Sequence, residues 1–121
     1  MPSDLIRLMQ SLFPAAGKCG EALWQPLLDV YQTRTGWLLK FELAGVRPED
    51  LHLEVQGNCL TLQGVRRDWF VEEGCRHYRM EIAYSEFKRS LELPCDLQRA
   101  SITTEYRYGL LLVRIEPEAE K

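Results

Sequence analysis

The chain has 121 residues, of which 45% are hydrophobic, and its formal net charge at pH 7 is −3. A chain of this length forms one domain and buries roughly two-thirds of its unfolded surface, which is enough for a substantial core. The acidic balance lacks the basic footprint of nucleic-acid-binding proteins. No apolar run approaches the roughly 18 residues of a membrane-spanning helix, and the first residues do not have the order of a secretory signal. We therefore expect a cytoplasmic protein with no membrane span and no nucleic-acid partner.

Residues 1–23 differ from the rest of the chain. Six apolar side chains recur there at helical spacing, Ser3 or Asp4 can cap the start of a helix, and Pro14 and Gly17 break the pattern. We predict a short helical N-terminal arm. It either packs on its own domain or on a second copy, or it binds another protein, since so much exposed apolar surface needs a partner. The six residues are Leu5, Ile6, Leu8, Met9, Leu12 and Phe13.

From Trp24 onward, alternation with a period of two predicts strands and not helices. Gly57-Asn58 is a two-residue hairpin signal, and the segment Pro48-Glu49-Asp50 predicts a single helical turn. Seven or more short strands with no helix between them predict an all-β fold, an immunoglobulin-like antiparallel β-sandwich over residues 24–116, followed by a short acidic tail at 117–121. The strands are expected at residues 27–32, 37–43, 51–56, 60–64, 78–82 and 87–93, and in a hairpin at 102–116 centred on Gly109.

One segment does not follow this alternation. Residues 65–74 are polar towards both ends but carry Trp69, Phe70 and Val71 together in the centre. The triplet either folds back onto its own sheet or forms a short strand that pairs with another chain, because exposed sheet edges invite such pairing.

The residue types that carry metal, redox or catalytic chemistry are sparse. The four cysteines (Cys19, Cys59, Cys75 and Cys95) are widely spaced and there are only two histidines, so we expect reduced thiols and no metal site. The chain has no glycine-rich phosphate loop, no G-x-S-x-G and no H-E-x-x-H. We therefore expect neither an enzyme nor a cofactor.

Six short motifs occur in a fixed order between Trp24 and Ile115. In this order and spacing, the chain resembles the small heat-shock proteins, the α-crystallin-domain family. The motifs are W-x-P at Trp24–Pro26, the strand that ends in Asp29-Val30-Tyr31, L-A-G-V-x-P-E-D-L at Leu43–Leu51, L-T-L-x-G at Leu60–Gly64, the Glu81 segment that runs to F-x-R and L-P, and Y-x-x-G-L-L at Tyr106–Leu111.

The chain departs from the family pattern at its turns. The family usually has Pro-Gly where this chain has Ala44-Gly45, and Asn where Tyr108 precedes Gly109. A bulky residue is disfavoured at positive φ, so we expect a turn other than type I′ at Tyr108-Gly109. No core position is lost, so the fold is still expected.

The resemblance implies a chaperone that works without ATP, binds partly unfolded client proteins through its arm and prevents their aggregation. It also implies self-association as a homodimer or small oligomer, in which a loop strand of one copy pairs with the first strand of the other. This exchange would set Trp69, Phe70 and Val71 against Leu28, Val30 and Tyr31 of a second copy.

A second implied contact is an edge groove that receives an apolar-x-apolar tripeptide from another subunit. Val113-Arg114-Ile115 matches the apolar-x-apolar pattern, but we place it on the inward face of the last strand. The tail that follows it is only six residues long and is acidic. We therefore expect dimers or small assemblies. Ile6-Arg7-Leu8 offers the same spacing, although it fits the helical arm equally well. The groove residues would be Leu51, Leu53, Val55, Ile102, Thr104 and Tyr106.

The alternative function is a co-chaperone-like interaction module. Such a module has the same sandwich fold but docks on one specific partner, and fold alone does not separate the two functions. The apolar arm and the exchange-type loop favour the chaperone.

Overall fold

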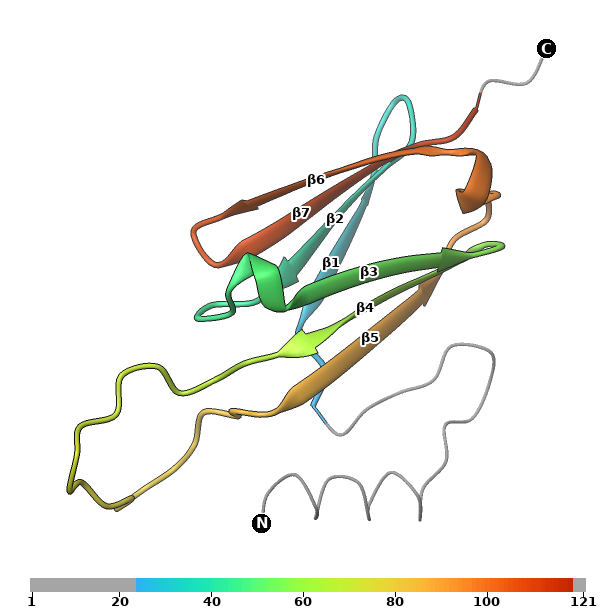
Figure 1. Ribbon diagram of the computed structural model, residues 1–121. Coiled ribbons are helices and arrows are strands. Elements are labelled where there is room, and N and C mark those ends of the chain that lie inside the picture. The colour runs from blue at the N-terminus through green and yellow to red at the C-terminus, as the bar shows by residue number, and fades with distance from the viewer. Residues whose placement is uncertain (1–23, 119–121) are drawn as a thin grey trace.

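The structure is a computed structural model and describes residues 24–118. Two antiparallel sheets pack face to face, which confirms the predicted β-sandwich (Figure 1). Two single turns of 3-10 helix, η1 (Pro48–Asp50) and η2 (Leu97–Arg99), lie in the connections. The strands are β1 (Leu28–Gln32), β2 (Trp37–Glu42), β3 (Leu51–Gln56), β4 (Cys59–Val65), β5 (Glu86–Glu92), β6 (Ser101–Arg107) and β7 (Leu110–Glu116).

One sheet has the strand order β1-β2-β7-β6 and the other has the order β3-β4-β5. The predicted arm with its six apolar residues lies outside the described residues, as do residues 119–121. No helix in the described part is long and apolar enough to cross a membrane.

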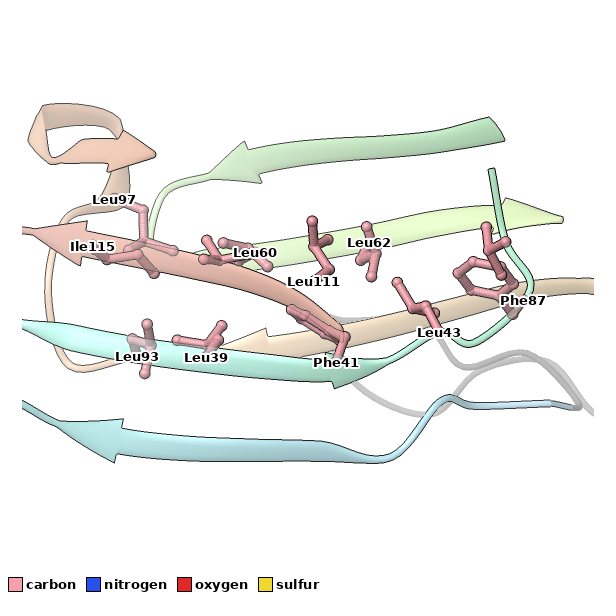
Figure 2. Close-up of a cluster of buried hydrophobic side chains, with 12 residues drawn as sticks. Leu39, Phe41, Leu43, Leu60, Leu62, Phe87, Leu93, Leu97, Leu111 and Ile115 are labelled. Atoms are coloured by element: carbon pink, nitrogen blue, oxygen red, sulfur yellow. The ribbon is translucent and has the colours of Figure 1, made fainter. Parts of the chain in front are cut away.

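The core lies between the sheets, and its side chains point into the space that the two inner faces enclose (Figure 2). Strand register puts apolar residues of neighbouring strands side by side: Leu39 pairs with Val113, and Phe41 pairs with Leu111. Burying one such side chain contributes about 1.5–3 kcal/mol. In the described part this core contains no buried polar side chain. It consists of Leu39, Phe41, Leu43, Val46, Leu60, Leu62, Phe87, Leu93, Leu97, Leu111, Val113 and Ile115.

The last strand is as predicted, because Val113 and Ile115 are fully buried in β7 and pair with Leu39 and Trp37. The triplet Val113-Arg114-Ile115 is therefore part of the sheet and is not free to enter a groove.

The W-x-P motif before β1 packs against β5 of the three-stranded sheet. Trp24 packs edge-on against Phe87 of β5, with ring centroids 5.0 Å apart. Pro26 is fully buried, and Arg89 Nη1 donates to its carbonyl oxygen at 3.5 Å. The start of the sandwich is thus anchored across both sheets.

The predicted strand at residues 78–82 is wrong. The segment forms no strand, and Tyr78, Met80 and Ile82 are all exposed. The ladder between β4 and β5 ends at the pair Val65–Glu86, followed by one further bond from Arg66 N to Ser85 O at 3.0 Å. Alternation fits a strand only where a neighbouring strand supplies hydrogen bonds, and none of the described strands pairs with this segment.

The expected departure from a type I′ turn at Tyr108-Gly109 is also wrong. Arg107 pairs with Leu110 across a two-residue turn, and both turn residues have positive φ, 52° at Tyr108 and 77° at Gly109. The Tyr108 ring is 94% exposed, so it meets no obstacle in this conformation. A single residue with this geometry costs about 1–2 kcal/mol, and the β6–β7 ladder offsets that cost.

The cysteines correct one further expectation. Cys59 is disulfide-bonded, whereas Cys75 and Cys95 are free thiols. The prediction of reduced thiols throughout was therefore wrong for Cys59. Spacing rules detect only cysteines that are close together in the sequence, and Cys59 has no cysteine near it.

Candidate functional site

The connection between β4 and β5, residues 66–85, projects away from the sandwich (Figure 1). It contains no helix or strand. Five of the nine exposed large hydrophobic side chains of the described residues lie in it. Clustered apolar exposure of this kind marks an interaction surface. The five are Phe70 (95% exposed), Val71 (55%), Tyr78 (103%), Met80 (49%) and Ile82 (59%).

The predicted triplet at the start of this loop is divided between two environments. Trp69 is half-buried and folds back, because its indole Nε1 donates to the carbonyl oxygen of Gly45 at 3.1 Å. The guanidinium of Arg47 lies 3.5 Å from the centre of its ring, which adds a cation–π contact. Phe70 and Val71 are instead largely exposed to solvent. The fold-back alternative thus holds for Trp69, while pairing with another chain stays a prediction for Phe70 and Val71.

Arg66 closes the base of the loop, a role that no sequence motif indicates. Its Nε donates to Ala83 O at 2.8 Å and its Nη1 donates to Ala44 O at 3.3 Å. Its guanidinium also lies 4.1 Å from the centre of the Trp24 ring. In the sequence Arg66 is one of two adjacent arginines in a polar stretch, which is typical of a solvated surface.

A cavity of about 570 Å³ lies at this base. Its walls combine both roots of the loop with the connection between β2 and β3. Trp24, Trp69, Phe70, Ile82 and Tyr84 supply apolar lining, and charged side chains of the loop roots complete it.

The first strand, β1, forms an edge of the four-stranded sheet and pairs with β2 alone among the described strands. Of the three residues predicted for dimer exchange, Leu28 is half-buried, while Val30 is 40% and Tyr31 is 45% exposed. Lys40 Nζ lies 4.7 Å from the centre of the Tyr31 ring. An edge strand with free backbone groups and accessible apolar side chains can accept a further strand.

At the opposite end of that sheet, a hollow of about 320 Å³ lies between β3 and β6. It contains four of the six predicted groove residues: Leu51, Leu53, Thr104 and Tyr106. The other two, Val55 and Ile102, are half-buried on the same strands but do not line it. Three further residues line the hollow at positions where the sequence pattern indicates a turn or the core. These are Pro48, Leu62 and Leu111.

Tyr106 is the polar feature of this groove. Its hydroxyl donates to Leu43 O at 2.7 Å. Burial raises the pKa of Tyr106 above its ordinary value, the charge of Glu42 raises it further, and a hydrogen bond with the backbone of Val46 acts in the opposite direction. The hydroxyl is therefore protonated and able to donate throughout the neutral pH range.

The two histidines of the chain do not join a cluster of acidic or cysteine side chains in the described part. His52 forms an exposed pair with Glu54, Nε2 to Oε1, at 3.0 Å. Among the described residues, no three histidine, cysteine or acidic side chains gather closely enough to hold a metal ion. The described part offers two apolar surfaces as candidate sites, the loop with β1 and the groove.

Comparison with known proteins fits this arrangement. The sequence profile of the Hsp20/alpha crystallin family matches residues 29–121. The chain belongs to this family. Small heat shock protein C2 of Rickettsia felis is 27% identical over 96 residues, which cover 79% of this chain and 62% of that protein. This Hsp20-family chain thus spans about three-fifths of that relative's length.

Two solved structures have the same sandwich. A small heat-shock protein from Xylella fastidiosa matches with a TM-score of 0.68 and 25% identity, over 83% of this chain and 92% of the other. The protein hspA from Xanthomonas axonopodis matches with a TM-score of 0.66 and 28% identity, over 79% and 96% of the two chains. The motifs read from the sequence had indicated this family correctly.

Proposed function

We propose that this Hsp20-family protein is an ATP-independent chaperone that binds partly unfolded proteins and prevents their aggregation. Family membership implies the chaperone role and a non-enzymatic protein. The observation that carries the more specific proposal is the concentration of exposed apolar side chains in the 66–85 loop. A holdase needs apolar surface that can become accessible, and this loop supplies it wherever it is not paired with another copy.

The proposal includes self-association through the loop and β1. Phe70 and Val71 are exposed in the loop, and Val30 and Tyr31 are exposed on an unpaired edge strand. Pairing the loop of one copy with β1 of another would satisfy free backbone groups and cover apolar surface on both copies. The Xylella relative forms a distinct high order structure. For this chain we propose a homodimer or a small oligomer.

The edge groove is proposed as a second contact site. Its lining is mostly apolar, and both strands beside it, β3 and β6, lie at sheet edges. An extended segment with two apolar side chains on one face fits such a site. Ile6-Arg7-Leu8 of a neighbouring copy is the candidate occupant. Cross-linking between positions 6 and 53 tests this assignment, and products confined to the arm itself would argue against it.

Client binding by the arm is proposed from the sequence pattern. Leu8 and Phe13 belong to the apolar face of the predicted helix, whereas Gln10 lies on the polar face. A Leu8→Asp/Phe13→Asp variant should therefore lose client binding, and Gln10→Asp should keep it.

The proposal is tested by heating a thermolabile client enzyme with the full chain, without ATP, and separating the soluble fraction by size-exclusion chromatography. A soluble complex that contains both proteins is expected. A client that precipitates as completely as it does alone would contradict the chaperone function. Binding to one particular native protein only would point to the interaction module.

The cytoplasm is the compartment that we propose. Disulfide bonds are uncommon there, so the bond at Cys59 makes the redox state of the protein in cells worth measuring. Quantifying free thiols in protein trapped directly from cells provides that measurement.

A further inference from the structure

The connection between β2 and η1 begins with a tight turn. Val46 N donates to Leu43 O at 3.1 Å, and Gly45 between them has a φ of +80°, as at the third position of a type II turn. Ala44 occupies the second position and, unlike a proline, has an N–H, which donates to Glu42 Oε1 at 3.1 Å. The turn is thus held at both of its ends by hydrogen bonds.

Three side chains from outside the turn donate to its three successive carbonyl oxygens. All three donors are distant from the turn in the sequence, so the turn links segments that are brought together only by the fold. The bonds are Tyr106 Oη to Leu43 O at 2.7 Å, Arg66 Nη1 to Ala44 O at 3.3 Å and Trp69 Nε1 to Gly45 O at 3.1 Å.

The donors belong to the two candidate surfaces. Tyr106 lines the edge groove, while Arg66 and Trp69 line the cavity at the base of the loop. The turn is also packed from the side, because a Cβ on Gly109 would lie only 3.1 Å from Cα of Ala44. A rotation of one of its peptide units therefore changes the hydrogen bonds of both surfaces together.

We infer that the 43–46 turn couples the edge groove to the loop, so that a change at Tyr106 alters how firmly Trp69 holds the root of the loop. Coupling of this kind is reciprocal, since each site must affect the other by the same factor. The consequence for the molecule rests on the function proposed above. An occupant of the groove that displaces the Tyr106 hydroxyl loosens the loop root and frees the loop for pairing with another copy.

The test uses the full chain with Tyr106→Phe, which removes the hydroxyl and keeps the ring. Tyr108→Phe is the matched control, because Tyr108 is 94% exposed at the neighbouring turn. The readout is hydrogen exchange of the Trp69 indole N–H by NMR, with the indole of Trp37 as an internal reference. A hydrogen bond of ordinary net strength corresponds to about a two- to tenfold change in such an equilibrium. We expect Trp69 exchange to accelerate by about this factor in Tyr106→Phe and to be unchanged in the control.

Unchanged Trp69 exchange in a folded Tyr106→Phe protein would overturn the inference, as would equal acceleration by Tyr108→Phe. The reverse variant, Trp69→Phe, should shift the Tyr106 ring resonances, and reciprocity fails if those resonances stay in place. Neither readout involves a client or groove ligand. Failure of the chaperone assay would therefore contradict the proposed function, whereas failure here would remove only the coupling.

Discussion

Phe70→Asp should weaken the dimer strongly while leaving the stability of the folded protomer nearly unchanged. The Phe70 side chain is 95% exposed in the single chain, so its replacement should change the free energy of unfolding of the protomer by no more than about 0.5 kcal/mol. In the proposed exchange the same side chain becomes buried against β1 of a second copy. Burial of a phenylalanine contributes about 1.5–3 kcal/mol, and a symmetric dimer contains the contact twice.

The expected loss is therefore about 3–6 kcal/mol of dimer stability, or a factor of about 10²–10⁴ in the dissociation constant. Sedimentation velocity over a dilution series measures this constant. Tyr78→Asp is the control, since Tyr78 lies in the same loop and is fully exposed, but is not one of the residues proposed for exchange. The reasoning is refuted if Phe70→Asp keeps the wild-type mass at every concentration, or if Tyr78→Asp dissociates the protein equally.

Three further predictions concern stability and reactivity. In Gly36→Ala, the new Cβ would overlap the carbonyl oxygen of Ile115. The unfolding midpoint in urea should therefore fall by the equivalent of about 1–3 kcal/mol. An unchanged midpoint would show that the turn can shift without cost. The raised pKa of Tyr106 means that its stabilising effect is complete below its ordinary value of 10.0 and is lost as pH rises through the higher folded-state value. Thermal melts should therefore show wild type losing stability above about pH 10 more steeply than Tyr106→Phe, and parallel curves would contradict this. Cys75 is exposed, whereas burial and the neighbouring Asp96 raise the pKa of Cys95. Iodoacetamide at pH 8 should therefore alkylate Cys75 faster than Cys95, which mass spectrometry measures. Faster labelling of Cys95 would contradict its burial.

The sandwich itself could be predicted from the sequence, because its strands depend on local alternation. In β7, Leu111, Val113 and Ile115 alternate with less buried residues, and all three are in the core. The same rule failed at 78–82, where the alternation is equally regular but no described strand pairs with it. Periodicity reports which side chains share a face, and pairing with a neighbour decides whether the backbone becomes a strand.

The candidate surfaces could be predicted only in part. The groove was expected from the family resemblance, but its lining includes Leu62 and Leu111, which no surface argument would select. The contacts of Trp69 and Arg66 were not predictable, because their carbonyl partners at Gly45 and Ala44 lie more than 20 residues away in the sequence. Hydrogen bonds from a long loop to a distant turn depend on the final packing and leave no periodic signal.

The most direct test of the chaperone function is light scattering from a heated client protein in the absence of ATP, with either the full chain or a chain that lacks residues 1–22. We predict that the full chain suppresses the increase in scattering and that the shortened chain does not, since the apolar arm is the proposed client site. Equal suppression by both chains would move the client site to the loop and the groove. An unreduced increase in scattering with the full chain would contradict the proposed function itself.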